Sequence, residues 1–137
     1  MGIIGRLRGL GRKPAREVRD TGQTKIVTRS SVGLVDGKHY TEFVDTVKQL
    51  KREKRHADAI ELLLKLVDAA EEEARAESWW AAPWYYEQLA IIFRKEKDDE
   101  AERAILVRYG DFQSSQGKAS GLFDERLEKV IVRMGKR

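Results

Sequence analysis

The amino-acid sequence predicts an all-α fold in which two stacked helix-turn-helix hairpins are followed by a C-terminal capping helix. A flexible basic N-terminal arm is expected to precede them. Three observations support this prediction. From Lys38 onward the apolar residues recur at helical spacing. A helix-turn-helix pattern occurs twice in this part, and the positive charge is concentrated at the beginning of the chain.

The first part, residues 1–37, is predicted to be a basic flexible arm and an extended linker. Residues 1–25 hold seven Lys or Arg against Glu17 and Asp20, whereas the rest of the chain has 20 basic and 21 acidic side chains. Four glycines among the first eleven residues disfavour a helix, since each costs roughly 1 kcal/mol relative to alanine. Residues 21–37 are rich in Gly, Ser and Thr, and Lys25–Thr28 could form one short strand.

The second part, residues 38–137, is predicted to be the helical domain, with five helices at about 40–55, 57–77, 83–97, 99–109 and 122–134. The third helix begins at Pro83, where a missing backbone N–H does no harm. The glycines and serines of residues 110–121 predict a loop. The charges of the second helix form a narrow stripe, so this helix should be covered on two sides. The stripe consists of Asp58, Glu61, Lys65, Asp68 and Glu72.

Apolar faces identify the residues that we expect in the core. The first helix carries Phe43, Val47 and Leu50 on one face, and Tyr86 and Phe93 should be buried in the third. The face of the fifth helix consists of Phe123, Leu127, Val130, Ile131 and Met134.

Six of the eleven aromatic residues gather within residues 78–93. Trp79 and Trp80 precede the third helix and cannot both face inward from adjacent positions. Two uses remain open for them: packing between the repeats, or a contribution to a surface that binds a ligand. Self-association is a further use of these aromatic residues.

The helix-turn-helix pattern repeats with an offset of 43 residues. A pair of helices cannot bury both of its faces, which is a physical reason for stacking a second pair against it. The offset pairs Phe43 with Tyr86, Val47 with Ala90, Leu50 with Phe93, Lys54 with Lys97 and Leu63 with Leu106.

Residues 40–109 resemble the tetratricopeptide-repeat (TPR) family. Ala59 followed by Leu63 is similar to the small-then-bulky pair of that family's second helix, and Pro83 stands at a repeat boundary. HEAT-like helix pairs share the longer period, so the resemblance is to a TPR-like fold. The stretch PWYYEQLAIIFRKEK also resembles small repeat proteins of actinobacteria and their phages. The resemblance implies an adaptor or scaffold whose first helices line a concave groove for a partner.

The sequence lacks the usual signs of catalysis. It contains no cysteine, and His39 and His56 have no second histidine at ligand spacing, so we expect no metal site. Glycine-rich phosphate-binding motifs are missing as well. We therefore expect a non-enzymatic protein with no cofactor and no small-molecule substrate. Its apolar runs are far shorter than the roughly 18 residues that span a bilayer, which favours a cytoplasmic protein or one peripheral at a membrane.

Two basic clusters lie at the C-terminal ends of the first helices of both repeats. Cations there stabilise a helix by offsetting its dipole, and by analogy with TPR proteins they could also bind an acidic segment of a bacterial or phage protein. The predicted partner-binding residues are Lys48, Lys51, Arg52, Trp79, Trp80, Trp84, Arg94 and Lys95.

The N-terminal arm offers an alternative function at an anionic membrane surface or on nucleic acid. Its cations could neutralise phosphates, and Ile3, Ile4, Leu7 and Leu10 favour a membrane because they add apolar burial. A plain disordered tail is the third possibility. The predicted anionic-surface residues are Arg6, Arg8, Arg12, Lys13, Arg16 and Arg19.

Overall fold

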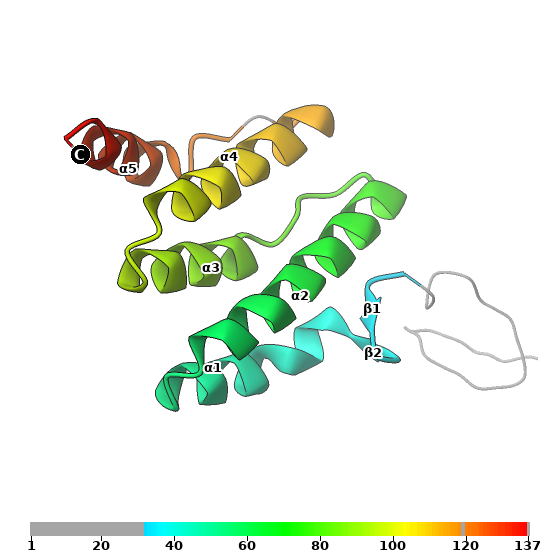
Figure 1. Ribbon diagram of the computed structural model, residues 1–137. Coiled ribbons are helices and arrows are strands. Elements are labelled where there is room, and N and C mark those ends of the chain that lie inside the picture. Colours follow the sequence, from blue (N-terminus) through cyan, green and yellow to red (C-terminus); the bar gives the residue numbers. More distant parts are fainter. Residues whose placement is uncertain (1–31, 119, 137) are drawn as a thin grey trace, which may run out of the picture. The chain divides into compact units, whose positions relative to one another are not determined.

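The computed structural model describes residues 32–118 and 120–136, and within these ranges the chain is mostly helical (Figure 1). The predicted all-α class is therefore confirmed, with five α-helices in the described part. By its contacts the chain divides into Met1–Leu34 and Val35–Arg137, and all five helices belong to the second unit. The elements are β1 (Leu34–Val35), β2 (Lys38–His39), the 3-10 helix η3 (Tyr40–Phe43), α1 (Val44–Arg52), α2 (His56–Glu77), α3 (Pro83–Lys95), α4 (Asp99–Ser115) and α5 (Asp124–Gly135).

The start of the helical unit differs from the prediction. A short hairpin pairs β1 with β2, and its turn places Asp36 and Gly37 at φ values of 50° and 82°. Asp-Gly is favoured in two-residue hairpin turns because both central residues need positive φ. Tyr40–Phe43 is a 3-10 helix and α1 ends at Arg52, so the first α-helix is shorter than the predicted range 40–55. The strand expected at Lys25–Thr28 lies outside the described residues.

Consecutive helices pack against each other in chain order, from α1 on α2 to α4 on α5 (Figure 1). The turn after α1 and the turn after α3 have the same backbone hydrogen bonds, shifted by the offset of 43 residues. In both turns a lysine adopts a left-handed conformation, with φ of 57° at Lys54 and 60° at Lys97. The corresponding bonds are Arg55 N to Leu50 O and Asp98 N to Phe93 O, both 2.9 Å, and Lys54 N to Lys51 O and Lys97 N to Arg94 O, both 3.0 Å.

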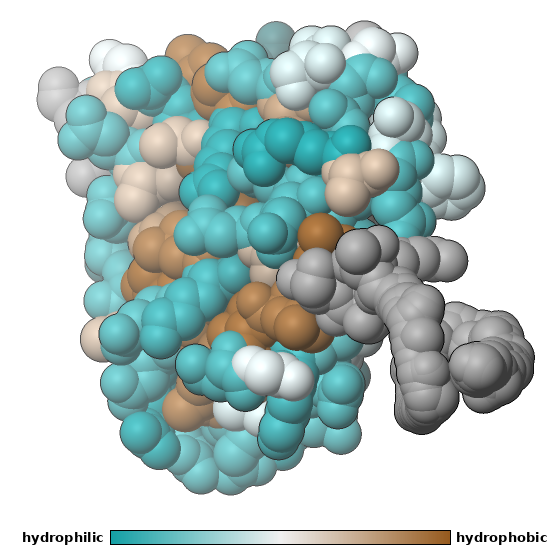
Figure 2. Space-filling view, turned by 90° about the vertical axis from the view of Figure 1, so that its right-hand side faces the viewer, coloured by the Kyte–Doolittle hydropathy of each residue, from teal (hydrophilic) through white to brown (hydrophobic). Residues whose placement is uncertain are grey.

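The core runs along α2 and α3. As predicted, α2 is covered on two sides, by α1 and α3, and its charged stripe from Asp58 to Glu72 is exposed. Tyr85 and Tyr86 contact opposite neighbours: Tyr85 packs edge-on against Tyr40 at 5.3 Å between ring centroids, and Tyr86 against Tyr109 at 5.0 Å. On the side of the molecule drawn in Figure 2, apolar surface remains only as patches between polar bands.

The predicted core residues are confirmed for the most part. Tyr86, Val47, Phe123 and Val130 are buried, whereas Phe43, Leu50, Phe93, Leu127 and Met134 are half-buried. Ile131 is 51% exposed, so its prediction as a core residue was wrong. The face of α5 that packs on α4 is narrower than the sequence pattern suggested.

Helix α4 continues to Ser115, so the prediction of a loop from residue 110 was wrong. The extra turns bury Phe112 and Gln113. The side chain of Gln113 accepts a hydrogen bond from Ala81 N at 3.2 Å and donates one to the Tyr109 hydroxyl at 3.3 Å. Gly110 costs the helix about 1 kcal/mol, and burying a side chain the size of Phe112 outweighs this cost, since it contributes about 1.5–3 kcal/mol.

The left-handed lysines permit a direct test of the turn geometry. Replacing Lys97 with glycine should raise the free energy of unfolding by about 0.5–1 kcal/mol. The left-handed backbone of a non-glycine residue is strained by roughly 1–2 kcal/mol, and glycine removes this strain. Part of the gain is lost because glycine gives the unfolded chain more conformational freedom. Urea denaturation followed by circular dichroism measures the change. As a control, Lys65→Gly in the exposed middle of α2 should lower stability by about 1 kcal/mol. A loss of stability in Lys97→Gly as well would contradict the assigned turn.

Candidate functional site

The predicted basic clusters lie on one side of the helical unit. Helices α1 and α3 both end in a tight turn to the next helix, and these two turns lie on the same side in Figure 1. We call this group of side chains the cationic end. It consists of Lys48, Lys51 and Arg52 at the end of α1 and Arg94 and Lys95 at the end of α3.

Lys51 and Lys95 are brought together from the two helices. The half-buried Lys51 ammonium donates a hydrogen bond to the Gln88 side-chain oxygen of α3. Burial lowers the pKa of Lys51, and the positive charge of Lys95 lowers it further, while Glu87 acts in the opposite direction. The two lysines therefore repel each other, and an anion bound between them would relieve that repulsion.

The other cations of this end differ in how they are held. Lys48 and Arg94 are exposed, and like Lys95 they form no ion pair with any residue in the described ranges. Arg52 donates to the side chain of Gln49 at 2.6 Å and so lies along the surface of α1.

Two carboxylates that follow α1 and α3 already have other partners. Glu96, which follows α3, bonds His56, and Glu53, which follows α1, lies 3.3 Å from the Arg55 guanidinium. Arg55 is also held by Asp58 at 2.9 Å. Glu53 therefore neutralises Arg55 and Glu96 is bonded to His56, while Glu87 is the carboxylate whose charge partly offsets that of Lys51.

A stripe of α3 connects the cationic end to Trp84. Trp84, Gln88, Ile91 and Lys95 follow each other at spacings of four, three and four residues and so share one face of the helix. On one flank, Lys51 of α1 bonds Gln88, and on the other flank Arg126 of α5 bonds Glu87 at 3.2 Å. We call this surface the first-helix face. Trp84 is half-buried and packs edge-on against Tyr85 at 5.0 Å.

Trp79 and Trp80 do not join this surface. They lie in the connection between α2 and α3, and their exposed fractions are 65% and 45%. The interpretation that they pack between the repeats was therefore wrong, since the buried Ala81 occupies that place and its N–H bonds Gln113. The predicted partner-binding residues therefore lie in separate places. Within α3, Lys95 is eleven residues from Trp84, which is about 16 Å of helix. Trp79 and Trp80 lie still farther from Lys95, in the connection that precedes α3.

A second group of charged residues, missed by the sequence analysis, connects three helices. The buried carboxylate of Glu71 accepts a hydrogen bond from the Tyr86 hydroxyl at 2.7 Å and two from Arg108 at 3.0 Å each. Arg108 also donates to Asp68 at 2.7 Å. Burial and the bond to Glu71 raise the pKa of Tyr86, and the same carboxylate raises the pKa of Arg108. Glu71 lies three residues after Asp68 at the edge of the polar stripe, which was the only sequence signal for its role.

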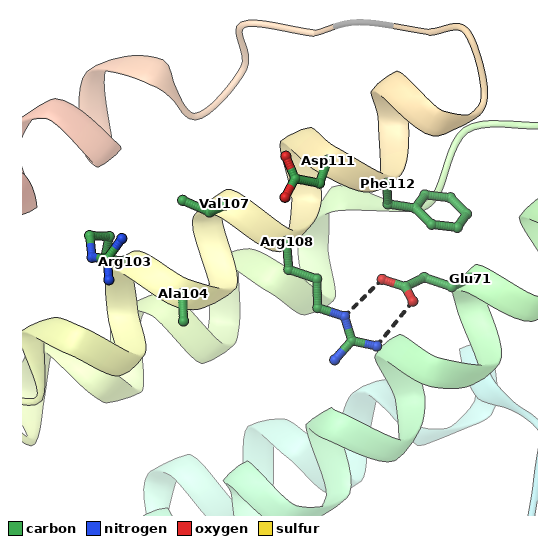
Figure 3. A pocket seen from close by; sticks show the side chains of 7 residues that line it. All are labelled: Glu71, Arg103, Ala104, Val107, Arg108, Asp111 and Phe112. Carbon is green, nitrogen blue, oxygen red and sulfur yellow. Dashed lines mark hydrogen bonds and ion pairs between the residues drawn. The ribbon is translucent and has the colours of Figure 1, made fainter.

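An open hollow of about 550 Å³ lies beside this group and is shown in Figure 3. Because Glu71 and Arg108 bond each other across it, their charged atoms are occupied in holding α2 to α4. Within the described ranges, no cluster of three or more His, Asp or Glu residues could hold a metal ion. The hollow is lined by Glu71, Arg103, Ala104, Val107, Arg108, Asp111 and Phe112.

Two further expectations concern membranes and the arm. Among the helices of residues 32–118 and 120–136, none is long and apolar enough to cross a membrane. The predicted anionic-surface residues, from Arg6 to Arg19, lie outside the described residues, so their role stays a prediction.

Comparisons with protein-family models, with curated proteins and with solved structures found no match to this chain.

The buried carboxylate predicts a strong dependence of stability on Arg108. Arg108→Met should lower the free energy of unfolding by about 2–4 kcal/mol, because it leaves Glu71 buried without its main cation. Adding Glu71→Gln should recover most of the loss, since a neutral amide can still accept the Tyr86 hydroxyl bond. Arg103→Met on the same helix is the control and should cost less than about 0.5 kcal/mol. Equal losses for Arg103→Met and Arg108→Met in urea denaturation would exclude this role.

The cationic end predicts a coupled titration. Lys95→Met should raise the pKa of Lys51, because a like charge that opposes its protonation is removed. Side-chain NMR titration of carbon-13-labelled lysine measures the effect, and Lys65→Met, which removes an exposed charge on α2, should leave the pKa of Lys51 unchanged. An identical response to both substitutions would show that the two lysines do not share a site.

Proposed function

We propose that this protein is a non-enzymatic, TPR-like interaction module whose first-helix face binds an acidic segment of a partner protein. The observation that supports the proposal best is the convergence of Lys51 and Lys95 from consecutive first helices. The Lys51 ammonium bonds Gln88 of α3, burial and the positive charge of Lys95 lower its pKa, and neither lysine forms an ion pair within the described part of the chain. A carboxylate placed between them would be favoured by both.

The charge balance supports an acidic partner over a purely structural role for these cations. The dipoles of α1 and α3 place roughly half a negative charge at each C-terminus. The five side chains of the cationic end carry five positive charges, so about four remain after the two helix ends have been neutralised. Single exposed ion pairs contribute only about 0.2–1 kcal/mol. Binding should therefore need several carboxylates and weaken with salt.

The α3 stripe suggests how such a segment lies. About 16 Å of helix separate Trp84 from Lys95, a distance that about five residues of extended chain would span at roughly 3.3 Å each. We expect acidic residues at the cationic end and an apolar residue, some five positions along the chain, on Trp84. Arg126 borders this path and is already bonded to Glu87, so it adds little free charge.

A pull-down from a bacterial lysate, with wild-type protein and a variant in which Lys51, Arg52 and Arg94 are reversed to glutamate, would identify proteins that depend on this surface.

A synthetic peptide tests the chemistry directly. A fluorescent peptide with four or more Asp or Glu residues followed by a phenylalanine should bind the full chain, and Lys95→Glu should weaken binding at least tenfold. This loss corresponds to about 1.4 kcal/mol, as expected when attraction to several carboxylates becomes repulsion. Fluorescence anisotropy over a salt series measures it.

The matched control is Lys65→Glu, which makes the same charge change at an exposed position on the stripe of α2. It should change the affinity less than twofold, and both variants should keep the wild-type helical circular dichroism. Equal weakening by the two substitutions would mean that only net charge matters, and the proposed site would be abandoned.

A further inference from the structure

The outer face of α5 carries apolar residues that nothing in the helical unit covers. Val132 is 53% exposed, and Leu122, in the turn before the helix, is 57% exposed. The inward face of the same helix holds the buried Val130 and the half-buried Leu127 and Met134. Since 100° separate consecutive helical residues, Val132 and Glu125 lie almost opposite the centre of that inward face.

Exposed apolar residues that lie close together often mark an interaction site. Of the seven large hydrophobic residues that are exposed in the described part, three lie between residues 122 and 132. Leu122 and Val132 lie at the two ends of the outer face, whereas Ile131 lies about 100° around the helix from Val132.

Charge along the outer face changes sign from one end to the other. Glu125 and Glu128 lie in the first half of α5, and Lys129 and Lys136 follow, all of them exposed. The helix dipole accounts for this order of charges, but it does not account for exposed apolar residues at both ends. A surface with this arrangement is complementary to a copy of itself turned by 180°.

The positions match in one antiparallel register. If Leu122 faces Val132 of a second copy, Glu125 faces Lys129 of that copy, because both pairs are centred on the level of Leu127. Two-fold symmetry then produces each pair twice, as in an isologous interface. We propose that α5 pairs antiparallel with α5 of a second copy of this chain and that the protein forms a dimer through this face.

The proposed contact is small. Helix α5 has 12 residues, about 18 Å of helix, so the interface falls at the low end of the size range for specific association. A reversible dimer with a dissociation constant on the order of 10–100 μM is expected. Within one chain Glu125 and Lys129 are only 3.9 Å apart and highly exposed, a weak pair that can be exchanged for the intermolecular one at little cost.

Analytical ultracentrifugation of the full chain from 5 μM to 1 mM tests the proposal. The wild type should show a monomer–dimer equilibrium, and Val132→Glu should weaken it at least tenfold. Ile131→Glu is the matched control, because Ile131 is equally exposed but lies about 100° around the helix, and it should change the constant less than threefold. A wild type that stays monomeric at 1 mM, or equal effects of the two substitutions, would refute the proposal.

Exchanging the charges tests the register. Glu125→Lys and Lys129→Glu should each prevent dimerisation, since each places like charges opposite each other in the homodimer. An equimolar mixture of the two variants should dimerise again, because every pair then joins opposite charges. If the mixture stays monomeric, or if replacing Trp79 and Trp80 with serine removes the association instead, α5 is not the interface.

Discussion

The buried carboxylate of Glu71 is the constraint on which the arrangement of the helices depends. It lies in α2, is bonded by Tyr86 of α3 and by Arg108 of α4, and therefore relates three helices to one another. A buried charge is costly unless each carboxylate oxygen has a hydrogen-bond partner. Tyr86 and Arg108 can reach Glu71 only when α3 and α4 lie within a narrow range of positions relative to α2. Apolar contacts alone would allow neighbouring helices to slide with smaller changes in energy.

The first-helix face follows from this constraint. With α2 and α4 joined through Glu71 and Arg108, α3 lies where Lys51 can bond Gln88 and Glu87 can bond Arg126. Polar side chains thus connect α3 to α1 and to α5, while the apolar residues of α2 and α3 form most of the core. The cations at one end of this face form no ion pair within the described part of the chain, and Glu53 and Glu96 beside them are bonded to Arg55 and His56.

Local patterns predicted the helices because they depend on short-range physics. Helical periodicity and Pro83 identified α3 at its correct first residue, and the offset of 43 residues reappears in the backbone bonds of both lysine turns. The parts that failed depend on contacts between distant residues. Gly110 and the serines after it indicated a loop, yet burial of Gln113 against Ala81 extends α4 through them. The exposure of Trp79 likewise follows from Ala81 filling the interface, which no pattern around Trp79 reveals.

The two proposed surfaces would act together. In a dimer through α5, each copy contributes one cationic end, so a partner with two acidic segments could bind both copies at once. The second contact would then be intramolecular, with an effective concentration that depends on the linker between the segments and reaches the millimolar range for short flexible ones. Sites that are individually weak, as exposed ion pairs imply, would gain affinity by this route. Because both the peptide contacts and the dimer contain exposed ion pairs, salt would weaken the two together, and binding of a divalent partner should fall more steeply with salt than binding of a single segment.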